Sequence, residues 1–409
     1  MKKLFTLFAS VALAVAALAP AAIHGRNQEQ TLKRNQEPTS KLVSKGREAI
    51  PDQYIVVFND WATGPVGAAS VAHELADYMA SVYGGKIKHK YKHALNGFAA
   101  NMTKEQALAL SQDPRVAYVE EDGVMHADTT QYSATWGIDR IDQRDLPLSG
   151  SYTYTTTASA VRAYVIDTGI DTGHAEFEGR ASNVYDAFGG SGNDCNGHGT
   201  HVSGTIGGKT YGVAKQVKPR GVRVLDCNGS GATSGIIAGV DWVTTNHISP
   251  AVANMSLGGG ASSSLDTSVK NLSNSGVFLA VAAGNSNADA CNSSPSRAAY
   301  GTAIAGVAAS DRNDYKASFS NYGTCVDLYG PGVNITSAWI GGGTTETNTI
   351  SGTSMASPHV AGVGALYKGA FGDASSSTVH SWIINNSTTG RILNNPSGTP
   401  NRLVYKSTL

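Results

Sequence analysis

The chain has 409 residues, enough for more than one domain and a large buried core. Its 31 basic and 31 acidic side chains balance to a formal charge of zero, so no excess of basic residues supports nucleic-acid binding. The 47 glycines and the low charged fraction of 15% favour a compact protein with many tight turns over a disordered chain.

Residues 1–21 have the pattern of a secretory signal peptide. Lys2 and Lys3 precede an apolar run from Leu4 to Ala19, and small residues at its end suit cleavage between about Ala19 and Ala22. A retained membrane anchor is the alternative, but the run is shorter than the roughly 20 apolar residues that a span needs. No later segment is apolar enough over that length, so we expect a secreted, extracellular protein without membrane contact.

The segment between residues 22 and 128 divides into a polar linker and a small α+β domain. Residues 22–50 lack apolar periodicity and are predicted to be a largely disordered linker. Residues 51–128 alternate strand and helix patterns. The predicted elements are a strand at 54–58, a helix at 71–79, a strand, turn and strand at 87–100 around Asn96-Gly97, a helix at 103–112 opened by the capping pair Thr103 and Gln106, and a strand at 116–119.

Residues 129–409 predict an α/β fold with a parallel sheet covered by helices on both faces, because short apolar strands alternate with helices. Ligands of such folds bind at the carboxyl ends of the strands. Asp167 and Asn285 follow predicted strands, and His198 and Ser354 begin predicted helices, so we expect all four to converge. The predicted strands are 163–166, 222–225, 252–255 and 277–281, and the predicted helices are 198–207, 234–246, 264–275 and 357–367.

Three motifs supply the groups for nucleophilic catalysis. Gly352-Thr353-Ser354-Met355-Ala356 presents a serine at the mouth of an apolar helix, with Pro358 predicted in its first turn. A serine hydroxyl needs an adjacent base, which His198 would be, and Asp167 would hold the imidazole. Taken singly, each has an ordinary explanation: a helix cap, a structural histidine (with His201 as the competitor) and a turn residue.

Together, in the order Asp, His, Ser, these motifs resemble the subtilisin-like serine proteases. The likeness is closest to the proteinase K branch and, within it, to aqualysin-type secreted bacterial enzymes. It runs from about Trp136 to about Lys368. Further matching blocks are Trp136-Gly137-Ile138-Asp139, Val222-Arg223-Val224-Leu225-Asp226-Cys227-Asn228-Gly229, Asn254-Met255-Ser256-Leu257-Gly258 and Ala282-Ala283-Gly284-Asn285.

The resemblance assigns roles to the catalytic residues. It implies a triad of Asp167, His198 and Ser354, and leaves His201 structural, as it does His359. It also implies that Asn285 and the Ser354 backbone N–H donate hydrogen bonds to the developing oxyanion.

The resemblance further implies a cleft that holds an extended peptide between two backbone segments. These are Gly229-Ser230-Gly231 and Ser256-Leu257-Gly258, and Ala283 and Gly284 wall the primary pocket on its other side. Because these walls are small and uncharged, we expect a serine endopeptidase of broad specificity that prefers apolar or aromatic side chains before the cut. Its partners would be protein and peptide substrates.

Residues 51–128 resemble the subtilisin propeptide, an intramolecular chaperone and inhibitor. An ordinary accessory domain is the alternative. Aqualysin-type enzymes begin shortly before the Trp-Gly pair, which places the new N-terminus at Thr129, so that 129–409 would be the catalytic domain. The expected product is a monomer made as a self-processed zymogen.

Export favours disulfides over free thiols for the four cysteines, and four cysteines allow three pairings. A zinc site is disfavoured because no C-x-x-C spacing occurs. The resemblance favours Cys195 with Cys227 and Cys291 with Cys325.

Calcium is the expected structural cofactor. Asp139, Asp142 and Gln143 cluster within five residues and offer the oxygens that a hard cation prefers. They match a calcium site of aqualysin relatives, and Asp327 matches the carboxylate of proteinase K's strong calcium site, although the neighbouring loop at 297–304 is longer here. Solvated surface acids are the alternative.

Two other functions remain as alternatives. A serine esterase of another fold is disfavoured because the serine lies in G-T-S-M-A rather than in a G-x-S-x-G elbow. A catalytically inactive, secreted inhibitor or binding module built on 51–128 is disfavoured by the presence of all three triad residues.

Overall fold

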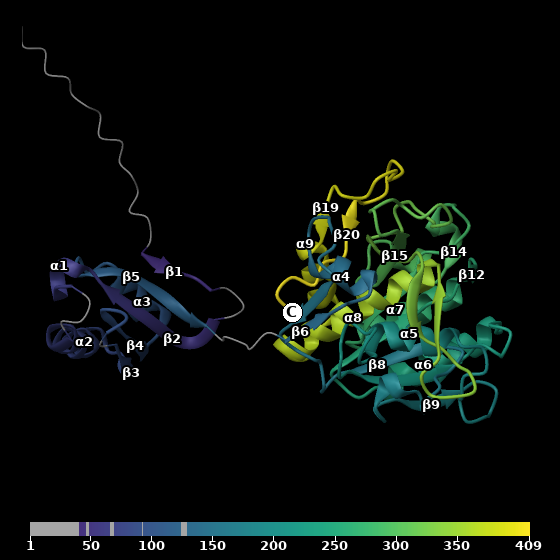
Figure 1. Cartoon of the computed structure of the whole chain (residues 1–409), viewed down its shortest axis with the longest axis horizontal. Coiled ribbons are helices and arrows are strands. Elements are labelled where there is room, and N and C mark those ends of the chain that lie inside the picture. Colours follow the sequence, from purple (N-terminus) through teal and green to yellow (C-terminus); the bar gives the residue numbers. More distant parts are fainter. Residues whose placement is uncertain (1–40, 46–48, 66–68, 92, 124–128) are drawn as a thin grey trace, which may run out of the picture. The chain divides into compact units, whose positions relative to one another are not determined.

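The chain folds into two units, residues 1–125 and 126–409 (Figure 1). The computed structural model describes residues 41–45, 49–65, 69–91, 93–123 and 129–409. The predicted signal peptide, most of the predicted linker and the segment 124–128 before the expected cut lie outside the described residues.

In its described part, the first unit is a five-stranded sheet on which helices pack. Its elements are β1 (Leu42–Val43), β2 (Ala49–Phe58), α1 (Asp60–Thr63), α2 (Ala69–Tyr83), β3 (Lys86–Lys90), β4 (Gly97–Asn101), α3 (Lys104–Ser111) and β5 (Val116–Gly123). The strand order is β1-β5-β2-β4-β3, and Val56, Met79, Phe98 and Leu110 are among the fully buried side chains of its core. The predicted α+β pattern is therefore what the structure contains.

Strand β1 corrects the prediction that 22–50 is a linker throughout. It pairs in parallel with β5, and β2 already begins at Ala49. Lys41 Nζ donates to the carbonyls of Asp113 and Val116, at 3.3 and 2.8 Å, which ties the segment to the sheet. A strand of two residues carries too little apolar periodicity to be found in a polar segment.

Of the turn predicted around Asn96-Gly97, Asn96 lies in the connection before β4, and Gly97 is already the first residue of that strand. A Cβ at residue 97 would lie 2.1 Å from the Val56 carbonyl oxygen, so the glycine serves close approach of β4 to β2. The predicted capping pair is confirmed, because the Thr103 hydroxyl accepts from the Gln106 N–H while the Gln106 side chain accepts from the Thr103 N–H.

The second unit is built on a nine-stranded sheet of order β19-β20-β16-β15-β13-β11-β8-β10-β9, in which every pair is parallel except β19 with β20. Its strands are β6 (Thr129–Tyr132), β7 (Ser151–Tyr154), β8 (Arg162–Asp167), β9 (Ser182–Asp186), β10 (Lys218–Arg223), β11 (Ala251–Met255), β12 (Gly259–Gly260), β13 (Phe278–Ala282), β14 (Ser293–Ser294), β15 (Ala305–Ser310), β16 (Leu328–Pro331), β17 (Ile335–Ala338), β18 (Thr347–Ile350), β19 (Thr388–Thr389) and β20 (Arg402–Leu403). Its helices are α4 (Trp136–Asp142), α5 (His198–Gly207), α6 (Thr233–Asn246), α7 (Ser263–Asn274), α8 (Thr353–Phe371) and α9 (Ser376–Asn386).

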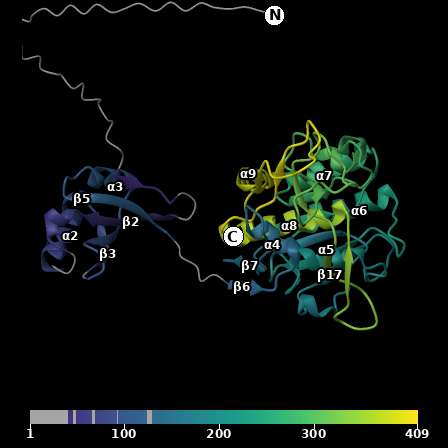
Figure 2. The ribbon, with the colours of Figure 1, turned by 45° about the horizontal axis from the view of Figure 1, so that its top comes forward.

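Helices cover both faces of this sheet, as predicted. Alternate residues of β8 enter different cores: Ala163 and Val165 pack with α5 and α8, whereas Tyr164 and Ile166 pack with α6 and α7. Helices α5 and α8 lie side by side (Figures 1 and 2). The buried strands are near-continuous apolar runs because both of their faces are covered.

Two element boundaries differ from the prediction in ways that shape the site. Strand β10 ends at Arg223 rather than continuing to Leu225. The Val224 N–H makes the last ladder bond, to the Asp167 carbonyl at 2.8 Å, and the Leu225 N–H bends back to the same carbonyl at 3.2 Å. Helix α8 begins at Thr353, four residues earlier than predicted, so Pro358 lies inside it and not in its first turn.

The two disulfides join the pairs that the resemblance favoured, Cys195 with Cys227 and Cys291 with Cys325. Within the described ranges, none of the helices combines the length and the apolar character that crossing a bilayer requires.

Candidate active site

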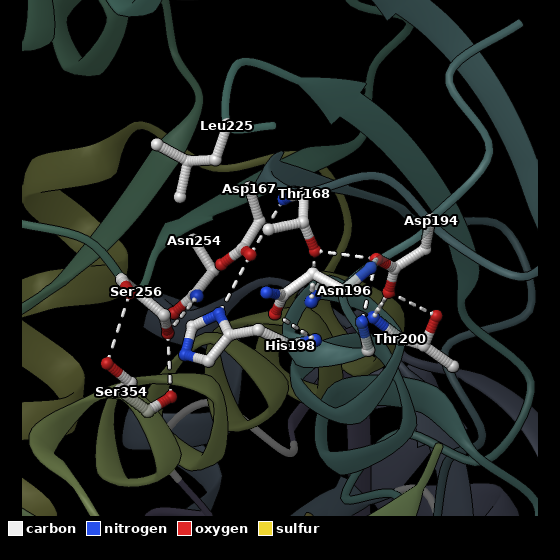
Figure 3. Close-up of polar contacts among 12 residues, drawn as sticks. Asp167, Thr168, Asp194, Asn196, His198, Thr200, Leu225, Asn254, Ser256 and Ser354 are labelled. Carbon is white, nitrogen blue, oxygen red and sulfur yellow. Dashed lines mark hydrogen bonds and ion pairs between the residues drawn. The ribbon is translucent and has the colours of Figure 1, made fainter. Parts of the chain in front are cut away.

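Three separate elements position the predicted triad (Figure 3). Asp167 is the last residue of β8, His198 is the first residue of α5, and Ser354 is the second residue of α8. Gly197 precedes α5 with a φ of 104°, and a Cβ there would lie 2.5 Å from the Trp339 ring. The glycine therefore lets the chain turn sharply into the helix that carries the histidine.

His198 and Asp167 form a direct hydrogen bond, with 2.8 Å between Nδ1 and Oδ1. Asp167 is fully buried, and Oδ1 also accepts the Thr168 N–H at 2.7 Å. Burial lowers the pKa of His198, but the charge and hydrogen bond of Asp167, aided by the charge of Asp194, outweigh it, so that the pKa is raised above 6.5. The carboxylate fixes the imidazole through Nδ1 and leaves Nε2 for proton transfer.

Ser354 lies on the other side of the His198 ring from Asp167 in Figure 3. Its hydroxyl donates to the Ser256 carbonyl at 3.1 Å, and among the described residues it makes no hydrogen bond to His198. Catalytic hydrogen bonds of free enzymes are often long and tighten only when substrate is present. The arrangement therefore provides a base beside a serine, whose hydroxyl is hydrogen-bonded to the Ser256 carbonyl in this structure.

Asn285 lies next to the start of α8. Its Oδ1 accepts the N–H and the hydroxyl of Thr353, at 2.8 and 2.9 Å, which fixes the amide. The Nδ2 group lies 3.5 Å from the position that a Cβ on Gly352 would take. The Ser354 N–H, in the first turn of α8, has no acceptor within the helix. The Ser354 nitrogen lies 3.6 Å from the same Cβ position, so two N–H donors approach one point at the start of α8.

Two adjoining cavities, of about 470 and 320 Å³, form a cleft at this site. They share Ser256, Leu257 and Gly258. The larger is also lined by His198 and by the predicted segment Gly229, Ser230 and Gly231. The smaller is also lined by Ala283, Gly284, Asn285 and Ser354, and all of its lining residues are uncharged. The structure therefore brings every residue predicted for substrate binding to one cleft.

Asp194 is a site residue that the sequence reasoning missed. Its carboxylate accepts hydrogen bonds of 2.7–2.9 Å from the N–H groups of Asn196, Gly197 and Thr200 and from the hydroxyls of Thr168 and Thr200. It thereby ties the residue after Asp167 to the first turn of α5. An aspartate shortly before a helix start is a known signal for such an acceptor.

His201 and His359 are structural, as the resemblance implied. Both are buried, and burial lowers the pKa of each to about 4. His201 Nε2 lies 3.0 Å from the Ile335 carbonyl, and His359 Nδ1 lies 2.8 Å from the Met355 carbonyl. Both are therefore neutral at pH 7 and hydrogen-bonded within the core.

The residues predicted for calcium lie in and after α4. Asp139 accepts the Ser149 hydroxyl and the Gly150 N–H, at 3.0 and 2.7 Å, and Gln143 Oε1 accepts the Ser149 N–H at 3.0 Å. Carboxylate, amide and hydroxyl oxygens thus gather in one place, a donor set that suits calcium. Asp142 instead pairs with Lys406 at 2.8 Å, a contact that a calcium ligand would have to give up.

Asp327 has two polar neighbours at one carboxylate oxygen. Its Oδ2 accepts the Gly306 N–H at 2.9 Å and lies 3.7 Å from His380 Nε2. A cation at this oxygen would have to displace both groups, and Asp327 as a calcium ligand stays a prediction. In the part of the chain that the structure describes, no three His, Cys, Asp or Glu side chains gather to hold a metal ion.

Comparisons with known proteins agree with this geometry. The subtilase family matches residues 160–404, and peptidase inhibitor I9 matches residues 53–128. An extracellular serine proteinase of Thermus sp. (strain Rt41A) is 51% identical over 373 residues, which are 88% of this chain and 90% of that protein. Alkaline serine exoprotease A of Vibrio alginolyticus is 46% identical over 91% of this chain and 70% of that protein.

A solved structure gives the same result. The crystal structure of a cold-adapted subtilisin-like serine proteinase is 50% identical, with a TM-score of 0.64, and the match covers 68% of this chain and 99% of that one. The chain therefore belongs to the subtilase family of serine proteases, and it carries an I9 inhibitor domain before its catalytic unit.

Proposed function

We propose that this subtilase is a secreted endopeptidase that cleaves proteins through Asp167, His198 and Ser354. The observation that carries the proposal is the 2.8 Å contact between a fully buried carboxylate and a histidine that lines the same cleft as a helix-start serine. The Thermus relative, which is named an extracellular serine proteinase, and the N-terminal sequence pattern support secretion.

The mechanism follows from the positions of these groups. Ser354 Oγ attacks the scissile carbonyl carbon while His198 Nε2 takes the hydroxyl proton. The tetrahedral oxyanion accepts hydrogen bonds from Asn285 Nδ2 and the Ser354 N–H. His198 then gives the proton to the leaving amine, and an acyl-enzyme remains. Water, activated by the same histidine, hydrolyses the ester and restores Ser354.

Broad specificity is supported by the cleft lining. The backbone of Gly229-Ser230-Gly231 and of Ser256-Leu257-Gly258 offers main-chain pairing to an extended peptide, which tolerates many sequences. The smaller cavity has no charged side chain to select a basic or acidic residue. Apolar or aromatic side chains should therefore be preferred before the cut.

We also propose that the enzyme is a zymogen that cuts itself before Thr129, give or take two residues. The match of residues 53–128 to an inhibitor family supports this, because a cleaved inhibitor of this kind blocks the cleft until it is degraded. N-terminal sequencing of active enzyme tests it. A fully active enzyme that begins near Pro51 or Ala22 would mean that the region before Trp136 is no propeptide.

We propose that calcium stabilises the catalytic unit at Asp139 and Gln143, with the Ser149 hydroxyl beside them. The gathering of their oxygens supports the proposal. The ion would be structural, because none of these residues lines either cavity of the catalytic cleft.

Titration with a serine-directed fluorophosphonate, followed by casein hydrolysis, separates this proposal from its alternatives. Labelling with proteolysis supports the endopeptidase. Labelling without proteolysis would favour an esterase, and no labelling of processed, folded protein would favour an inactive binding module.

A further inference from the structure

Helix α8 has an unusual feature next to the proposed nucleophile. Pro358 lies four residues after Ser354, inside the helix. In an α-helix the carbonyl of one residue accepts the N–H of the residue four positions later, and proline has no N–H. The Ser354 carbonyl therefore cannot receive its regular helical hydrogen bond, and it needs another donor.

Ser256 supplies that donor. Its hydroxyl donates to the Ser354 carbonyl at 2.7 Å, and its own carbonyl accepts the Ser354 hydroxyl at 3.1 Å (Figure 3). Ser256 is 3% exposed, and it follows directly after strand β11. One residue at the end of a sheet strand thus holds the proposed nucleophile by both its main chain and its side chain.

A buried amide fixes the direction of the Ser256 hydroxyl. Asn254 Nδ2 donates to Ser256 Oγ at 2.8 Å, and Asn254 Oδ1 accepts the Ser357 hydroxyl at 2.6 Å. Asn254 and Ser357 are fully buried. Because Ser256 Oγ already accepts a hydrogen bond from Asn254, its single proton is directed to the Ser354 carbonyl. The network therefore joins the end of β11 to two residues of α8, Ser354 and Ser357, the second of which directly precedes Pro358.

We propose that Ser256 is a positioning residue for Ser354, and that its hydroxyl replaces the N–H that Pro358 lacks. The proposal rests on the proposed role of Ser354 as the nucleophile. The Ser354 carbonyl and side chain share one Cα, so a carbonyl that loses its donor and shifts will carry the hydroxyl with it. A misplacement of about 1 Å can cost about 100-fold in rate.

The Ser256→Ala variant is therefore expected to lower kcat by about 10- to 100-fold. KM should change little, because the variant keeps the backbone of residues 256–258 that lines the cleft. Ser376→Ala is the matched control. The Ser376 hydroxyl is also buried and donates to a main-chain carbonyl, that of Val277, at 2.6 Å, but it lies outside both cavities. Its kcat should equal that of the unmodified enzyme.

A double-mutant cycle with Pro358→Ala provides the decisive test. Alanine restores an N–H four residues after Ser354, so the Ser354 carbonyl regains a donor without Ser256. The kcat loss caused by Ser256→Ala should then be at least several-fold smaller in the Pro358→Ala background. Equal losses in both backgrounds, or an unchanged kcat in Ser256→Ala, would overturn the proposal.

Two controls keep the result interpretable. If Ser256→Ala does not yield folded active enzyme, the same cycle is measured as unfolding temperatures of the uncleaved Ser354→Ala chain. There too, Pro358→Ala should reduce the cost of Ser256→Ala, and an undiminished cost would contradict the proposal. If Ser354→Ala itself kept full activity, the proposed nucleophile would be wrong, an outcome distinct from failure of the cycle.

Discussion

Replacing Asp167 by asparagine tests the electrostatics of the site most sharply. The substitution keeps the side-chain shape, and an oxygen at the Oδ1 position can still accept the Thr168 N–H and hold His198 Nδ1. What disappears is the negative charge 2.8 Å from the imidazole. At an effective dielectric constant of about 20, a unit charge pair at this distance is worth about 6 kcal/mol. Loss of that stabilisation from the imidazolium formed in the transition state corresponds to about 10⁴ in kcat.

The pH profile of kcat/KM for a chromogenic peptide supplies an independent readout. His198 must be neutral to act as the base, and Asp167 raises its pKa, so activity is lost as the pH falls through that raised value. In Asp167→Asn the acid limb should move to lower pH, because the main raising influence is gone while burial still lowers the pKa. An acid limb at an unchanged position, or a kcat within tenfold of the parent, would refute this reasoning.

The remaining predictions concern the oxyanion donors, the calcium site and a disulfide. Asn285→Ala should lower kcat by about 10²–10³ with little change in KM, the loss typical of removing one oxyanion donor from a subtilisin, and an unchanged kcat would remove Asn285 from the mechanism. Excess chelator should lower the unfolding temperature and hasten self-digestion, because the ion binds the folded form. Asp139→Ala should reproduce part of that shift, and an identical melting curve with and without chelator would exclude structural calcium. Replacing both Cys291 and Cys325 by alanine should lower the free energy of unfolding by about 4 kcal/mol, because their disulfide closes a loop across a separation of 34 residues in the unfolded chain. Denaturant unfolding measures this loss.

Strong local patterns in the sequence were sufficient for much of the fold. The helix at 198–207 has the predicted bounds, and the Thr103 capping pair closes as predicted. The predicted ends of helices and strands were wrong where a tertiary contact overrides the local preference of the sequence. Strand β10 stops at Arg223, where the Leu225 N–H bends back to the Asp167 carbonyl, a partner far away in sequence.

The start of α8 was misplaced for a related reason. The local sequence places Pro358 in the first turn, but the helix starts earlier because Asn285 and Ser256 hold its first turn from the segments that follow β13 and β11. No local pattern contains those partners. The convergence of Asp167, His198 and Ser354 could be expected from motifs and strand ends. The bridging role of Asp194 could not, because its partners come together only in the folded chain.

The most direct test of the central claim is casein hydrolysis by purified Ser354→Ala protein, compared with the parent at equal concentrations of folded enzyme. The account predicts that proteolysis and fluorophosphonate labelling are lost, while the unfolding temperature of the uncleaved chain shows an intact fold. Residues before Thr129 should also stay attached, if maturation is intramolecular. Casein hydrolysis at the parental rate by Ser354→Ala would contradict the assignment of the nucleophile and the mechanism built on it.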